Sequence, residues 1–282
     1  MKPGKKNTIM VHNEIIRSAI LFLIGCLLSC CALHRERTQP IFFDSSPNAP
    51  VPAPVIETLR KRANKISTIK SSVTMHVKYN ALAKTEKLTG FIAIGGPGKV
   101  RFKGFTLLGL TLFDLAVRDG QMQLFLPGKD ELYQGDLKAV YDSPLALPFL
   151  PCDISAIFYP AMYDSPKLQF REIEGYYILS VPDETIANSR RCRYLWIEKK
   201  QLLVRKMEIY SQDGLETVCN LDNYQLINEN YFPFMIEIVR QPDRSRIRIA
   251  VNSIKVNDTI DSNAFYIDAK NVKKINKLGK SK

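Results

Sequence analysis

The chain has 282 residues, of which 45% are hydrophobic and 24% charged, and its formal net charge at pH 7 is +12. This length suits one large domain and is awkward for two, while the positive charge favours anionic membrane headgroups or acidic partners. Few cysteines lie beyond the first 31 residues and they are widely spaced, which excludes a disulfide framework and a Cys-x-x-Cys metal site.

The first 29 residues have the pattern of a secretory signal peptide. Basic residues stand near the start, an apolar run extends from Ala19 to Ser29, and a polar stretch follows. The run is too short to span a bilayer comfortably, as is typical of a leader. We therefore expect residues 1–29 to be a signal peptide, and Cys30, the residue that follows them, indicates a signal peptide of the lipoprotein type.

Cys30 is the most informative residue of this region. It follows Leu27-Leu28-Ser29, and Leu-Leu-Ser-Cys resembles the lipobox of bacterial lipoproteins, in which the cysteine becomes the first mature residue and carries the acyl groups. Such groups anchor a chain stably, since each buried methylene contributes ~0.8 kcal/mol. The next residue is Cys31 and not Asp, which by this resemblance favours the periplasmic face of the outer membrane. The alternative is a plain signal anchor in which Cys30 merely ends an apolar helix.

Residues 30–54 are expected to form an acylated N-terminus and a proline-rich tether. Five prolines fall between Thr38 and Pro54, and such segments favour extended polyproline II structure. The next segment, Val55–Ile66, has apolar residues at helical spacing and basic residues elsewhere on the helical wheel. It predicts one amphipathic helix.

From Ser71 onward, many short segments alternate between apolar and polar residues. Turn sequences such as Asp119-Gly120 and Asp213-Gly214 separate several of them, as in hairpins. The pattern predicts an antiparallel meander of about eleven strands, mainly β in class. The segments are Ser71–Tyr79, Lys87–Ile94, Lys99–Lys103, Leu110–Arg118, Gln121–Leu126, Lys167–Glu174, Tyr176–Val181, Arg193–Ile197, Leu203–Tyr210, Glu216–Tyr224, Phe234–Arg240 and Arg246–Val251, with Ser253–Val256 as a further candidate.

One segment, Ser143–Tyr163, breaks the alternation. It is apolar, contains four prolines and has no Lys or Arg. It is too interrupted to span a membrane and too apolar for an open loop. We expect one or two short helices that cover the apolar face of the sheet.

Catalytic and metal-binding signals are absent from the sequence. It has no nucleophile elbow, phosphate loop or His-rich spacing, and no spacing singles out an acid/base pair among its carboxylates. We therefore expect no enzymatic activity, no metal and no cofactor. A lipoprotein signal also removes the chain from nucleic acid, the other partner that a basic protein suggests.

Three cysteines and a basic terminus leave alternatives open. Cys152, Cys192 and Cys219 could supply one disulfide or remain buried free thiols, and the sequence cannot choose a pair. Residues 269–282 are rich in lysine and are expected to form a disordered tail, with a headgroup-binding tail as the alternative.

Arg205 stands in the period-two register of its segment, between Leu203 and Met207. If that face is internal, Arg205 is a buried cation and must have a partner. If the register slips by one residue, Arg205 lies on the surface. Both interpretations are kept.

The order of these elements resembles the Lol-type lipoprotein carriers, the superfamily of the periplasmic carrier LolA and the outer-membrane receptor LolB. The resemblance covers roughly residues 55–268 and is carried by a pattern of weak local signals. They are Gly90–Ile94, Lys99–Phe102, Leu107-Leu108-Gly109, Asp119-Gly120, Tyr231-Phe232-Pro233 and Asn257 through Phe265.

The resemblance implies an incomplete β-barrel formed by a single antiparallel sheet, with a helical lid over a concave face that holds acyl chains. It implies an insertion loop at Leu107 and Leu108, with Leu108 the better candidate, although proline is usual at the position of Leu107. The lid residues implied are Leu150, Ile154, Ile157 and Phe158. The cavity-lining residues expected on this fold are Val73, Met75, Val77, Val100, Phe102, Phe113, Leu115, Met122 and Leu124.

The expected function is therefore that of a LolB-like lipoprotein, anchored through Cys30, that binds acyl chains and receives or inserts lipoproteins. Its expected partners are lipoprotein acyl chains or lipid, the membrane and a periplasmic carrier protein. The alternative is a structural or envelope-assembly lipoprotein, because every β domain needs a filled core and the apolar stripe could be one.

Overall fold

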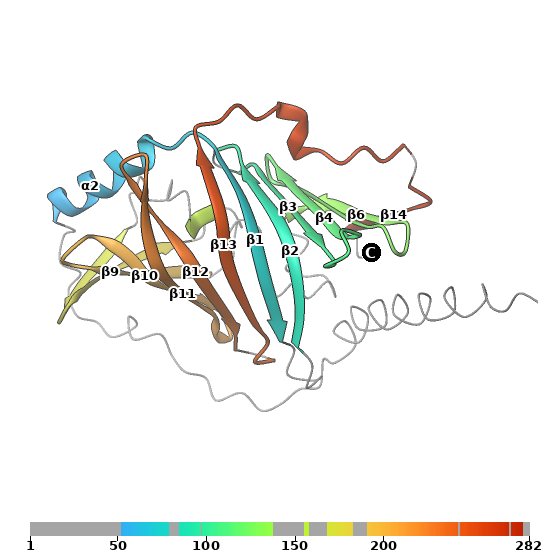
Figure 1. The fold of residues 1–282 in the computed structure, drawn as a ribbon. Helices are drawn as coiled ribbons and strands as arrows, with labels where there is room; N and C mark the ends of the chain where they lie inside the picture. Colours follow the sequence, from blue (N-terminus) through green and yellow to red (C-terminus); the bar gives the residue numbers. More distant parts are fainter. Residues whose placement is uncertain are drawn as a thin grey trace, which may run out of the picture.

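The computed structural model describes residues 52–78, 85–96, 98–137, 155–157, 168–182, 191–241, 243–270 and 272–278. These residues form a single 14-stranded sheet that is open at both edges and curled (Figure 1). The strands are β1 (Ile69–Lys78), β2 (Thr85–Ile94), β3 (Val100–Phe105), β4 (Thr111–Arg118), β5 (Gln121–Leu126), β6 (Glu131–Asp136), β7 (Gln169–Ile173), β8 (Tyr176–Pro182), β9 (Cys192–Glu198), β10 (Leu203–Ser211), β11 (Gly214–Ile227), β12 (Asn230–Arg240), β13 (Arg246–Val256) and β14 (Lys274–Leu278).

The sheet consists of two antiparallel meanders that meet at one seam. In the first, β1 to β6 lie in chain order, and in the second, β7 to β13 do the same. The two meanders join where β1 pairs with β13, so that Met75 lies opposite Ile249. Alternation along β1 buries Val73, Met75 and Val77 and leaves the intervening side chains outside, which is why this segment forms a strand with one apolar face.

The predicted sheet is confirmed in class, but its strand count of about eleven is wrong. The structure adds β6 and β14, and it merges the last two predicted segments into β13, which has a bulge opposite Ser72 and Val73. In β6, Leu132 is the only fully buried side chain, so the strand has little apolar alternation to reveal it. One pair, β14 with β6, is parallel, so the sheet is not wholly antiparallel.

The expectation of a disordered tail from residue 269 is wrong for residues 274–278. These residues form β14, which extends the sheet beside β6. Lys274 forms an ion pair of 2.8 Å with Glu131, and Leu278 packs against the main core. Lys274, which the sequence predicts to be solvated, therefore contributes to the attachment of this strand.

The helix α2 (Ala53–Asn64) lies across one end of the sheet (Figure 1). It starts two residues earlier than predicted, after Pro52, and its buried side chains Val55, Ile56, Leu59 and Ala63 are those of the predicted apolar stripe. The Arg62 guanidinium donates to the carbonyl oxygens of Gln201 and Leu202 at 3.0 and 2.9 Å, which ties the helix to the β9–β10 turn. Within the described residues, no helix has the length and apolarity needed to cross a membrane.

The C-terminal segment crosses the outer face of the first meander before it reaches β14. It includes a short 3-10 helix, η3 (Ser262–Phe265). On that face Arg101 is ion-paired with the buried Asp114, and its guanidinium also donates to the carbonyl oxygens of Ala264 and Tyr266. One guanidinium therefore fixes the C-terminal segment against β3 and β4.

Candidate functional site: the apolar face and its hairpin

The inner face of the curled sheet is one continuous apolar cluster. It includes buried side chains from β1 to β5 and from β8 to β13, together with the buried side of α2. Cross-strand pairs build it row by row; for example, Phe102 lies opposite Leu115, and Leu115 lies opposite Leu124. This apolar face is the candidate surface for binding an apolar ligand.

All nine predicted cavity-lining residues belong to this cluster or pack against it. Eight of them are buried, and Phe113 is half-buried and packs edge-to-face on Phe102 with ring centroids 5.1 Å apart. The eight are Val73, Met75, Val77, Val100, Phe102, Leu115, Met122 and Leu124.

Two glycines in this face make room for neighbouring side chains. Gly90 of β2 lies opposite Gly104 of β3, and a Cβ atom on either would meet a neighbouring side chain. At Gly104 the neighbour is the Phe113 ring, and at Gly90 it is the Met75 methyl carbon, at 2.9 Å. Phe113 and Met75 therefore occupy the space that a side chain at position 104 or 90 would need.

Of the predicted lid, only part lies within the described residues. Residues 155–157 are helical, and Ile157 is partly buried against the main core. Leu150, Ile154 and Phe158 lie outside the described residues. The lid therefore stays a prediction. The contact of Ile157 with the main core is consistent with it.

The predicted insertion loop is the hairpin between β3 and β4. Leu107 and Leu108 are 65% and 80% exposed, and Leu110 is 49% exposed. The turn is closed by Thr106: its amide donates to the Leu110 carbonyl at 2.9 Å, and its side-chain oxygen accepts from the Leu110 amide at 3.1 Å. Gly109 has a φ of +80°, a backbone conformation that favours glycine. The hairpin thus presents three leucines to solvent on an ordered turn.

Arg205 is not an internal cation. It is the extra residue of a β-bulge, because Val204 pairs with Ile197 and Lys206 with Trp196. The bulge turns its guanidinium towards the surface, where it donates to Glu198 Oε2 at 2.9 and 2.7 Å. The surface interpretation of the sequence is therefore correct, although Arg205 keeps a carboxylate partner.

Cys192 and Cys219 form no disulfide with each other in the part of the chain that the structure describes, so a bridge between these two is excluded. Cys219 is buried, and burial raises the pKa of the Cys192 thiol above its ordinary value. Cys152 lies outside the described residues. Among the residues that the structure describes, no group of three or more His, Cys, Asp or Glu side chains could hold a metal ion.

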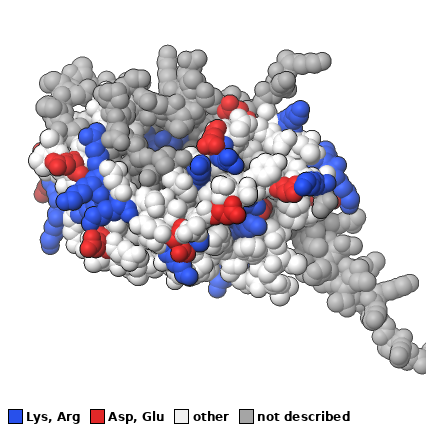
Figure 2. Space-filling model, turned by 90° about the horizontal axis from the view of Figure 1, so that it is seen from above, with Lys and Arg blue, Asp and Glu red and all other residues white. Residues whose placement is uncertain are grey.

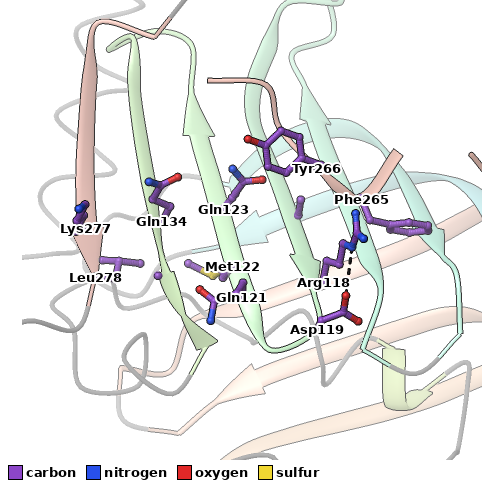
Figure 3. Close-up of a pocket in the computed structure, with 12 residues that line it drawn as sticks. Arg118, Asp119, Gln121, Met122, Gln123, Gln134, Phe265, Tyr266, Lys277 and Leu278 are labelled. Atoms are coloured by element: carbon purple, nitrogen blue, oxygen red, sulfur yellow. Dashed lines mark hydrogen bonds and ion pairs between the residues drawn. The ribbon is translucent and has the colours of Figure 1, made fainter. Parts of the chain in front are cut away.

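An open pocket of about 550 Å³, which the sequence analysis did not predict, lies on the outer face. It lies where Phe265 and Tyr266 pass over β4 and β5 and where β14 joins the sheet (Figure 3). Its polar wall includes Gln123, whose amide oxygen accepts from the Ile267 amide at 2.8 Å, and an exposed ion pair of 3.2 Å between Arg118 and Asp119. Because its walls come from segments far apart in the chain, no local motif could have revealed it.

Comparisons with known proteins bear on the fold. No protein-family model and no curated protein matches the sequence. A LolA superfamily protein from Nitrosomonas europaea, 15% identical, aligns over 77% of this chain and 99% of its own length with a TM-score of 0.58. A DUF1329 family protein from Desulfovibrio piger, 12% identical, covers 76% of this chain and 95% of its own, at 0.57.

A third solved structure is a domain from Vibrio parahaemolyticus assigned to outer membrane lipoprotein sorting. It is 11% identical, covers 74% of this chain and 95% of its own length, and has a TM-score of 0.53. At such identities the likeness concerns the fold. The chain therefore has a LolA/LolB-like fold: one open, curled β-sheet with an apolar inner face.

Proposed function

We propose that this chain is a lipoprotein of the bacterial cell envelope that binds acyl chains of a lipid or lipoprotein on the inner face of its sheet. The observation that carries the proposal is the continuous apolar cluster on an open sheet of this fold. An acyl chain in water costs ~0.8 kcal/mol for every exposed methylene, so a protein that carries one must enclose it in an apolar surface. The solved neighbours named for LolA and lipoprotein sorting support this class of cargo.

Anchoring through acyl groups on Cys30 belongs to the same proposal. The lipobox-like Leu-Leu-Ser-Cys sequence supports it, as does the proline-rich stretch between Cys30 and the first described residue, Pro52. Residue 31, which is Cys and not Asp, supports the outer membrane as the destination. In this arrangement the folded domain works on the periplasmic face, within reach of a periplasmic carrier protein.

The β3–β4 hairpin has the properties required to pass cargo into a bilayer. Leu107, Leu108 and Leu110 are exposed on a turn with its own hydrogen bonds, so they can enter hydrocarbon without unfolding a strand. Moving an exposed leucine side chain from water into hydrocarbon lowers the free energy, and the leucines of this turn can make that transfer while the strands stay in place. We assign this hairpin the insertion role, with Leu108 as its most exposed residue.

Burial of eight of the nine predicted cavity residues favours a second candidate, a structural envelope lipoprotein with a packed interior. Mass spectrometry of lipids that co-purify with the exported protein lacking Cys30 distinguishes the two. The acyl-chain carrier predicts acylated lipids or acylated peptides in stoichiometric amount, which organic solvent extracts. Protein that carries no acyl compound, and takes up none when incubated with a triacylated peptide, contradicts the carrier and supports the packed interior.

A further inference from the structure

Basic side chains form a cross-strand row on the outer face of the sheet. His76 of β1 lies directly opposite Lys87 of β2 on one side and Arg248 of β13 on the other. In the next register position, Lys78 lies opposite Arg246. All five side chains are exposed, and they share the outer face because the alternate residues Met75 and Val77 are buried. We name these five residues the cationic row.

The cationic row is poorly neutralised by the protein itself. Arg246 and Arg248 share one carboxylate, Glu237, at 3.6 and 2.8 Å. Lys78 and Lys87 have no carboxylate partner within the described residues. Like charges directly opposite each other in a sheet are destabilising, as are those of Lys78 and Arg246. An anionic partner outside the chain would relieve this repulsion.

The row and the exposed leucines lie at the same end of the sheet. Thr89 of β2 pairs with Phe105 of β3, so Lys87 and Leu107, each two residues further along, are level across the strands. Neighbouring strands are about 4.8 Å apart, which sets His76 roughly 10 Å from β3. In Figure 1 the ends of β1 and β2 lie beside the β12–β13 hairpin, at the end of the sheet opposite α2.

The other end of the molecule also carries basic residues, but in a different arrangement. Figure 2, the view from above, shows Lys and Arg on both the left and the right of this face, and the group on the left lies on the side on which Figure 1 has α2. There Arg62 is bound to backbone carbonyls and Lys65 is paired with Glu229 at 2.8 Å. The cationic row differs because it adjoins an exposed apolar hairpin and has two lysines without a carboxylate partner in the described part of the chain.

We propose that the cationic row and the leucine hairpin together form a docking surface for a bilayer rich in anionic phospholipids. Phosphate groups of the headgroups would lie against the row while the leucines enter the apolar layer beneath. The complementary charge and the adjacent apolar tip identify this occupant, because a free phosphate would use the row but leave the leucines in water. The surface requires no cargo, so it stands or falls separately from acyl-chain binding.

The test is binding of the soluble chain to vesicles. Every described helix and strand lies between Ala53 and Leu278, so a chain that starts at Ala32 keeps the described fold without leader or anchor. Its affinity is measured by co-sedimentation with vesicles of phosphatidylcholine, alone or mixed with phosphatidylglycerol. The test variant is Lys78→Gln with Lys87→Gln. The matched control, Lys200→Gln with Lys255→Gln, removes two exposed charges at the other end of the sheet.

The wild-type chain is expected to bind the anionic vesicles and not those of phosphatidylcholine alone, and to release them as salt is raised. The test variant should bind about 25-fold more weakly, at about fivefold for each charge near the surface, and the control should change less than threefold. Equal weakening in both variants, or no preference for anionic vesicles, overturns the proposal. So does displacement from the vesicles by millimolar inorganic phosphate at constant ionic strength, which would assign the row to a free phosphate.

Discussion

Gly90 and Gly104 face each other across β2 and β3, and the space above them is occupied by Met75 and Phe113. This packing makes a first prediction. Gly104→Ala should lower the free energy of unfolding by roughly 1–3 kcal/mol, because the new methyl group overlaps the Phe113 ring. Urea unfolding measures the loss. Adding Phe113→Leu should restore part of it, with a coupling of at least about 0.5 kcal/mol. Strictly additive effects would show that the two side chains do not share this space.

A second prediction concerns Leu108. Leu108→Glu should leave the melting temperature unchanged, since the side chain is 80% exposed, and should block transfer of acylated cargo into vesicles, because a carboxylate enters hydrocarbon at high cost. Leu226→Glu is the matched control, because Leu226 is 59% exposed on the β11–β12 hairpin at the other end of the sheet. Full transfer by Leu108→Glu, or equal loss in the control, removes the insertion role.

The ion pair between Arg101 and Asp114 supplies a third prediction. Both side chains are largely buried, so Asp114→Ala should lower the free energy of unfolding by about 3–5 kcal/mol, because it leaves the Arg101 cation without its carboxylate. The exposed pair of Arg118 and Asp119 provides the comparison: Asp119→Ala should cost about 1 kcal/mol or less. Thermal unfolding of the two variants measures the difference. Similar costs would mean that the Arg101 contacts to Ala264 and Tyr266 do not depend on Asp114.

Much of this fold follows from the sequence, and its gaps have physical causes. Strands with buried alternate residues, such as β1, were predicted because period-two burial leaves a readable pattern. β14 was missed because its lysine-rich sequence has no alternation of apolar residues and its partner β6 is distant in the chain. The bulge at Arg205 shifts the register by one residue, which no pattern of apolar residues specifies. The outer pocket needs segments that only the tertiary fold brings together.

Glu131 makes the attachment of β14 dependent on pH. Hydrogen bonds from Lys274 and Tyr133 hold the pKa of the Glu131 carboxyl below its ordinary value. A carboxyl whose pKa is lowered by folding stabilises the fold above its unfolded pKa, about 4.3, and this contribution disappears as the pH falls below that value through the folded pKa. Between neutral pH and about pH 3, the wild-type chain should therefore lose more stability than Glu131→Gln. Urea unfolding at both pH values measures this, and identical losses would contradict it.

The proposed acyl anchor at Cys30 can be tested directly. Cys30→Ala combined with Cys31→Ala should leave the chain without acyl mass and without processing by the lipoprotein pathway, because no cysteine then follows the apolar run that ends at Ser29. Intact-mass spectrometry of both forms, recovered from membranes, checks this. A wild-type mature chain with a free, unmodified N-terminus elsewhere would contradict the anchor, and acylation of the doubly substituted chain would assign it to another cysteine.

The β1–β13 seam has a consequence for how the chain folds. β1 ends at Lys78 and β13 begins at Arg246, so these partners are separated by most of the described domain. Each meander can form from local hairpins, whereas the seam requires closure of a very long loop, which is slow. Until β13 has been synthesised, β1 is an open edge with an apolar side, the kind of surface that aggregates. We therefore expect a protein of this topology to need its β1 edge shielded until β13 has paired with it.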